Sequence, residues 1–111
     1  MSGNKRKEGD RINVELLVDY NAGGNYLFDF CKDLGAGGIF ISSKEPKEAG
    51  EEIELTFTIP DNKKTVSLKG KVMWSQKPSS NQTTPGMGIQ FIDYDKSARK
   101  SLEEFVKRYS K

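Results

Sequence analysis

Apolar and polar residues alternate in most segments of the chain, and this period of two constrains the fold more than any other feature. In RINVELLVDY, residues 11–20, every second residue from Ile12 onward is apolar or aromatic. Successive side chains of a β-strand point to opposite faces, so the pattern predicts a strand with one buried face. The same alternation returns in IELTFTIP, residues 53–60, and in TVSLKGKVMW, residues 65–74.

Three further segments are predicted to form short strands. They are YLFDFCK (26–32), with Tyr26, Phe28 and Phe30 on one face, GIFIS (38–42) and GMGIQFID (86–93). NAGGN, residues 21–25, is a hairpin signal. We therefore predict six or seven short antiparallel strands. Regularly spaced strands separated by turn residues are typical of a small β-barrel, in which closure removes the sheet edges.

The last segment has a helical period instead. Its apolar residues recur at spacings of three and four: Ala98, Leu102, Phe105, Val106 and Tyr109. This spacing predicts an amphipathic C-terminal α-helix over residues 96–109, with Asp95 as its N-cap. We expect a mainly β fold in one domain, residues 11–111, preceded by a flexible basic tail, residues 1–10.

The composition argues against several classes of protein. The chain has 111 residues, no histidine and one cysteine, so it lacks an imidazole base and a thiolate or imidazole metal cluster. We therefore expect neither an enzyme nor a resident cofactor. A net charge of +2 is too small to indicate non-specific nucleic-acid binding. Without a secretion signal or a run of about 20 apolar residues, we expect a cytoplasmic protein that does not insert into membranes.

The stretch DLGAGG, residues 33–38, interrupts the alternation with three glycines. Glycine is unfavourable inside a strand, so the chain either bends sharply here or lets a ligand approach its backbone. Gly35, Gly37 and Gly38 are consistent with a tight bend or a bulge. Asp33 is suited to two roles, an Asx turn that bonds its own backbone and a contact to a ligand.

The order of these motifs resembles the PilZ domain family, six-stranded bacterial barrels that sense cyclic di-GMP. The resemblance spans roughly residues 5–109. The family pattern of two arginines separated by three residues corresponds to KEGDR, where Arg11 matches and Lys7, preceded by Arg6, does not. The family pattern of Asp or Asn, any residue, Ser, two residues and Gly corresponds to DLGAGG, with Gly35 in place of the serine. GMGIQF, which contains Gly88, is similar to the late strand of the family.

The resemblance implies a binding site for cyclic di-GMP. Its members in this sequence are Arg6, Lys7, Arg11, Asp33, Gly35, Gly37, Gly38 and Gly88. Arginine binds phosphate or the guanine edge and stacks on rings, and a carboxylate accepts from guanine N1–H and N2–H₂. Residues 5–10 would then fold over the bound nucleotide. Lysine at position 7 lacks the planar fork, and Gly35 lacks a hydroxyl donor.

Three functions follow from these observations. The first is a cyclic di-GMP receptor, a monomer or weak dimer that acts through a protein partner. The second is a PilZ-like interaction module that binds no nucleotide and docks on motility, pilus or signalling proteins. The third is a small-barrel binder of single-stranded nucleic acid, against which the nearly balanced charge argues, so we expect no nucleic-acid polymer as a partner.

Overall fold

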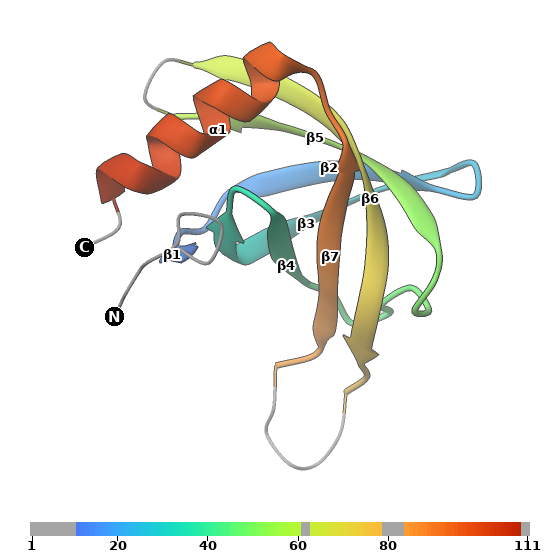
Figure 1. Cartoon of the computed structure of the whole chain (residues 1–111). Helices are drawn as coiled ribbons and strands as arrows, with labels where there is room; N and C mark the ends of the chain where they lie inside the picture. Colours follow the sequence, from blue (N-terminus) through green and yellow to red (C-terminus); the bar gives the residue numbers. More distant parts are fainter. Residues whose placement is uncertain (1–10, 61–62, 79–83, 110–111) are drawn as a thin grey trace, which may run out of the picture.

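The computed structural model describes residues 11–60, 63–78 and 84–109, and strands dominate it (Figure 1). The elements in chain order are β1 (Arg11–Asn13), β2 (Leu17–Ala22), β3 (Asn25–Gly35), β4 (Gly38–Ser42), β5 (Glu52–Ile59), β6 (Lys64–Gln76), β7 (Gly86–Asp93) and α1 (Lys96–Tyr109). No helix within the described ranges has both the length and the apolar character needed to span a membrane.

Six of the strands close into an antiparallel barrel. They follow one another in the order β2, β3, β4, β7, β6 and β5, and β5 pairs back with β2. β1 is an additional strand that pairs with the end of β3. The predicted mainly β fold, a small antiparallel barrel with a C-terminal helix, is therefore confirmed.

The inward-facing side chains of the strands form the core. The largest fully buried strand residues are Val18, Leu34, Ile39, Ile41, Ile53, Leu55, Ile59, Val66, Val72 and Met87. Helix α1 lies across one end of the barrel (Figure 1) and contacts β1, β3, β5 and β6. It buries Ala98, Leu102, Phe105 and Val106 there. Complete burial of a leucine-sized side chain stabilises a fold by about 1.5–3 kcal/mol, so this contact closes the end of the core.

The start of α1 is capped as its sequence predicted. Asp95 Oδ1 accepts a hydrogen bond from the backbone N–H of Ala98 at 2.7 Å. Lys107 and Arg108 lie in the last turn, where positive charges interact favourably with the negative end of the helix dipole.

The segment expected as one strand over residues 11–20 is interrupted. Asn13 of β1 pairs with Asp33, and Leu17 of β2 pairs with Phe30. The three residues 14–16 therefore lie opposite only two residues of β3, 31 and 32. The backbone N–H of Cys31 donates to Leu16 O at 2.9 Å within this interval. The extra residue acts like a bulge and divides the expected strand into β1 and β2.

Two short turns join the strands on either side of β3. Gly23 and Gly24 connect β2 to β3 with φ values of 61° and 89°, which confirms the predicted hairpin. Ala36 and Gly37 connect β3 to β4, so the glycine-rich stretch contains a tight turn. This turn places the start of β4 beside the end of β3, which also pairs with β1.

Candidate functional site

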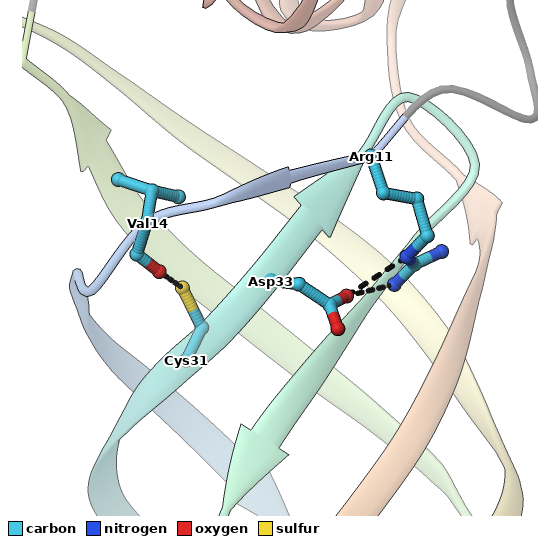
Figure 2. A network of polar contacts seen from close by, with 4 residues as sticks. All are labelled: Arg11, Val14, Cys31 and Asp33. Atoms are coloured by element: carbon cyan, nitrogen blue, oxygen red, sulfur yellow. Dashed lines mark hydrogen bonds and ion pairs between the residues drawn. The ribbon is translucent and has the colours of Figure 1, made fainter. Parts of the chain in front are cut away.

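Arg11 and Asp33, two of the predicted site residues, form an ion pair on the outer surface of the barrel. Arg11 Nε donates to Asp33 Oδ1 at 2.8 Å, and Nη2 lies 2.6 Å from the same oxygen. Figure 2 shows both contacts ending at that oxygen, so Nη1 and Oδ2 take no part in them. The two side chains are 44% and 34% exposed, and such pairs contribute only about 0–1 kcal/mol to stability. Rearrangement of the Arg11 and Asp33 side chains by a ligand therefore costs little free energy.

Asp33 lies inside β3, two residues before its end, and not in the turn. Its carboxylate bonds Arg11, and the described contacts include no bond to its own backbone. The interpretation of Asp33 as an Asx-turn residue is therefore wrong. A bulge between Cys31 and Asp33 explains this position. Cys31 pairs with the buried Ile41, whereas Asp33 pairs with Phe40, so the extra residue turns Asp33 to the outer surface.

A row of paired residues crosses the outer surface from Asp33. Asp33 pairs with Phe40 of β4, Phe40 pairs with Gly88 of β7, and Gly88 pairs with Trp74 of β6. Adjacent strands lie about 4.8 Å apart, so the row spans about 14 Å. An acidic hydrogen-bond acceptor thus stands at one end of the row and an indole at the other.

Trp74 and Phe40 form an aromatic pair on the outer surface, with Trp74 over Gly88 and Phe40 over Gly86. Their ring centroids are 5.5 Å apart and their planes differ by 23°, which is a stacked arrangement. A Cβ built on Gly88 would lie 2.3 Å from Trp74 Nε1, so only glycine leaves room for the indole. The Trp74 side chain remains 49% exposed. One face of this pair is consequently packed on the barrel, and the pair offers a flat apolar surface to the outside.

The alternation in β6 predicts Trp74 on the same face as Val72, and this prediction is wrong. A bulge between Val72 and Trp74 inserts one residue, because Val72 pairs with Ile89 and Trp74 with the next residue, Gly88. Met73 and Trp74 are both about half exposed as a result. The sequence suggests two roles for Trp74, a core residue or part of a partner surface, and this exposure rules out the core.

The three glycines of DLGAGG differ in their surroundings. A Cβ on Gly38 would lie 2.5 Å from the carbonyl oxygen of Ile89, so this glycine permits close pairing of β4 with β7. Gly37 is exposed and nothing lies within 4 Å of the corresponding position. Gly35 is buried and pairs with Arg11. The bend predicted for this stretch is confirmed, and Gly38 serves the strand pairing.

These residues line one open hollow of about 1070 Å³, here called the outer hollow. Its lining includes Arg11, Asp33, Gly37, Gly38, Phe40, Trp74, Gly88, Gln90, Tyr94 and Arg99. The hollow thus joins Arg11, Asp33, Gly37, Gly38 and Gly88, five of the predicted site residues. Gly35 is not in its lining, although it pairs with Arg11. Arg6 and Lys7 lie outside the described residues.

Helix α1 and the segment before it supply side chains that the sequence analysis missed. Arg99 projects from the first half of the helix, and its guanidinium lies 5.8 Å from the centre of the Tyr94 ring. The Tyr94 hydroxyl donates to the carbonyl oxygen of Ala36 at 2.6 Å, which ties this region to the β3–β4 turn. No local motif marks Arg99, because only the packing of α1 on the barrel brings it to the hollow.

Two groups outside the outer hollow have shifted pKa values. Burial raises the pKa of the Cys31 thiol, whose Sγ–H donates to Val14 O at 3.3 Å (Figure 2). A protonated, fully buried thiol is a poor nucleophile, which agrees with a structural role for Cys31. Burial, together with the hydrogen bond to Asp29, raises the pKa of Tyr20 well above its ordinary value.

The model of one protein family matches the chain. It is described as the PilZ domain, and it matches residues 4–108. No curated protein sequence matches the chain.

Several solved structures resemble the barrel, and two of them are described here. One is the inhibitor of motility MotI/DgrA of Bacillus subtilis, with a TM-score of 0.81 and 15% identity over 95% of this chain. The chain spans only 51% of that protein's length. The other is the PilZ domain of CeSA from a cellulose-synthesizing bacterium, with a TM-score of 0.62 and 17% identity. That match covers 88% of this chain and 95% of the domain. At these identities the likeness concerns the fold.

Proposed function

Because the chain belongs to the PilZ domain family, we propose that it is a receptor for cyclic di-GMP and that the nucleotide binds in the outer hollow. The observation that carries this proposal is the row from Asp33 to Trp74. It places an acceptor for a guanine edge and a flat surface for a purine ring about 14 Å apart on one surface. A ligand with two guanines can use both ends.

Each end of the row has a definite chemistry for guanine. Asp33 accepts from guanine N1–H and N2–H₂ through its two carboxylate oxygens once Arg11 turns toward the ligand. The exposed face of Trp74 stacks on a purine, and Phe40 behind it holds the indole in place. Stacking of a base on an aromatic side chain contributes about 1–3 kcal/mol.

The phosphates of the ligand need cations. Arg11 and Arg99 supply two guanidinium groups to the hollow. In this proposal Arg6 and Lys7 add further positive charge when residues 5–10 fold over the nucleotide. Arg11 has the central role because it lies beside Asp33 and can bond phosphate or guanine O6 and N7 as a planar fork.

When residues 5–10 fold over the bound nucleotide, they change the surface that the chain shows to a partner. In this proposal the chain is a signalling adaptor in the cytoplasm. Contact of the changed surface with another protein then passes on the signal. The structural similarity to an inhibitor of motility supports motility as one setting for this contact.

A second function is supported by Gly35. Glycine there lacks the hydroxyl of the family's serine, and a hydrogen bond to a charged group is worth about 1.5–3 kcal/mol. If that loss abolishes nucleotide binding, the barrel is an interaction module that docks on its partner without a ligand.

The test is a titration of cyclic di-GMP into the purified chain, with GTP as a control ligand. Calorimetry measures affinity, and the fluorescence of Trp74, the only tryptophan in the sequence, reports contact in the hollow. We expect saturable heat and quenched emission with cyclic di-GMP. Arg11→Ala should weaken binding by about ten- to a hundredfold. Lys71→Ala, on an exposed position of β6 outside the hollow, is the matched control and should bind normally.

The two functions predict different results in this experiment. If a folded chain gives neither heat nor quenching, the receptor proposal is wrong and the interaction module stands. If binding occurs but Arg11→Ala leaves its affinity unchanged, the nucleotide binds elsewhere on the barrel.

A further inference from the structure

The outer face of the β2–β3 ribbon carries exposed apolar side chains that do not belong to the core. They are Leu17, Tyr26, Phe28 and Phe30, with exposures of 50%, 81%, 64% and 50%, and we call them the aromatic stripe. The residues of β3 between them turn inward, since Leu27 and Asp29 are only partly exposed. Contiguous exposed apolar side chains of this kind mark sites of protein interaction.

The same part of β3 has an open edge. From Asn25 to Phe30 it pairs only with β2 among the described residues, because its pairing with β4 begins at Cys31. The two-residue turn makes Ala22 and Asn25 the first hydrogen-bonded pair of the hairpin. Alternation along the strand then leaves the N–H and C=O groups of Tyr26 and Phe28 facing away from β2. Unpaired backbone groups along a strand edge are a template for one more strand.

A groove of about 630 Å³ lies beside this edge. Leu27, Phe28 and Asp29 of β3 line one side, and Ser43, Lys44 and Pro85 belong to the other. The groove shares no residue with the outer hollow, so a partner and a nucleotide can bind together.

The charge of the ribbon selects the chemistry of the occupant. Residues 17–30 contain two carboxylates, Asp19 and Asp29, and no lysine or arginine. Asp19 is exposed and pairs directly with Phe28 across the ribbon. The groove itself is balanced, with Asp29 and Glu45 against Lys44 and Lys47. The outer face therefore sets the preference. A guanidinium over the aromatic stripe makes a cation–π contact with the rings and is attracted by the negative charge of Asp19.

We propose that the edge of β3 binds an extended segment of a protein partner in which arginine or lysine alternates with small apolar residues. The segment adds a strand to the barrel and bonds the free backbone groups of Tyr26 and Phe28. Its basic side chains lie over the aromatic stripe and Asp19, and its apolar side chains enter the groove beside Leu27. The inference rests on the proposed function only in that an adaptor needs a partner.

The probe is a short synthetic peptide, blocked at both ends, in which valine and arginine alternate. We titrate it into the ¹⁵N-labelled full chain and follow the amide signals. We expect shifts centred on residues 25–30 and slower hydrogen exchange at Tyr26 and Phe28. The same peptide N-methylated at alternate residues cannot pair along one edge and should not bind. Equal binding of the methylated peptide, or an absence of shifts in residues 25–30, overturns the proposal.

Two variants test the side chains. Phe28→Ser and Asp19→Lys change exposed positions, and each should weaken peptide binding by about tenfold. Tyr109→Ser, which removes a 53% exposed aromatic ring on α1, is the matched control and should bind the peptide normally. Equal peptide affinity of Phe28→Ser and the unaltered chain also overturns the proposal.

Cyclic di-GMP is titrated into the same samples to separate this inference from the receptor function. A chain that binds nucleotide and not peptide refutes the docking edge alone. A chain that binds peptide and not nucleotide refutes the receptor alone. If the shifts at residues 25–30 appear on concentrating the chain without peptide, the edge pairs with a second copy, and the proposed partner is wrong.

Discussion

At the scale of single residues, glycines that are adjacent in the sequence have unrelated structural roles. Gly38 lies so close to β7 that a side chain would meet the backbone of Ile89, and backbone cannot move aside as a flexible side chain can. Gly37, one position earlier, has open space around it and no positive φ. A motif that counts both as glycine therefore combines a packing requirement with a position that other residues can occupy.

These roles predict opposite results for two similar substitutions. Gly38→Ala should lower the free energy of unfolding by about 1–3 kcal/mol, because β4 and β7 must separate to admit the methyl group. Gly37→Ala, its matched control, should be neutral or stabilising by up to about 1 kcal/mol, because it restricts the unfolded chain. Urea unfolding of both variants measures this difference. Equal losses would show that the close contact at Gly38 has no energetic consequence.

At the scale of elements, two β-bulges create the outer hollow. The bulge in β3 turns Asp33 outward, and the bulge in β6 does the same for Trp74. Without them, the alternation would direct both side chains to the face that Cys31 and Val72 occupy in the core. Bulges are frequent beside binding sites because they re-aim single side chains without disturbing the rest of a sheet.

A different contact joins β2 to β3 across the ribbon. The hydroxyl of Tyr20, which is only 2% exposed, donates to Asp29 Oδ2 at 2.6 Å. Burial and Asp29 raise the pKa of Tyr20, so the folded state holds the phenolic proton more tightly than the unfolded chain does. This contribution to stability is complete below the ordinary tyrosine pKa of about 10 and is lost as the pH rises above it.

Tyr20→Phe removes both the hydrogen bond and this titration. We expect a loss of about 0.5–1.5 kcal/mol at neutral pH. Between about pH 9 and 11 the unaltered chain should lose more stability than the variant, because only the unaltered chain must keep a buried phenol protonated. Urea unfolding of both proteins across this range is the measurement. Parallel pH profiles would mean that Tyr20 ionises as freely in the barrel as in the unfolded chain.

At the scale of the whole molecule, the outer hollow collects residues from distant parts of the chain. Arg11 lies near the start of the chain and Arg99 near its end. The surface between them comes from β3, β4, β6 and β7. A ligand that contacts all of these elements stabilises the assembled barrel as a unit, because the unfolded chain offers no such site.

This coupling predicts a thermal effect of cyclic di-GMP. At a ligand concentration 100 times the dissociation constant, the folded state gains about 2.7 kcal/mol, or about 10 °C in Tm for a domain of this size. Differential scanning fluorimetry should show this rise, and GTP should not produce it. Arg11→Ala should reduce the rise at the same ligand concentration. A rise that is equal in Arg11→Ala would place the ligand outside the hollow.

The sequence alone determined the kind of fold. Alternation identified the strand segments, the glycine pair at 23–24 identified a hairpin, and helical spacing with Asp95 identified the capped terminal helix. These signals are local, since a strand or a helix expresses its period in neighbouring residues. The motif DLGAGG likewise directed attention to the part of the surface where Asp33 and Arg11 meet.

Only the tertiary structure decided the composition of the candidate site. A bulge sets two residues of one strand opposite one residue of its partner, so neither strand shows it by itself. The exposure of Trp74 follows from such a bulge. Gly88 was part of a motif, but its contact with Trp74 depends on the register between β6 and β7. Arg99 reaches the hollow because α1 packs across the barrel end. Local periodicity specifies elements, whereas register and packing specify which of their side chains meet.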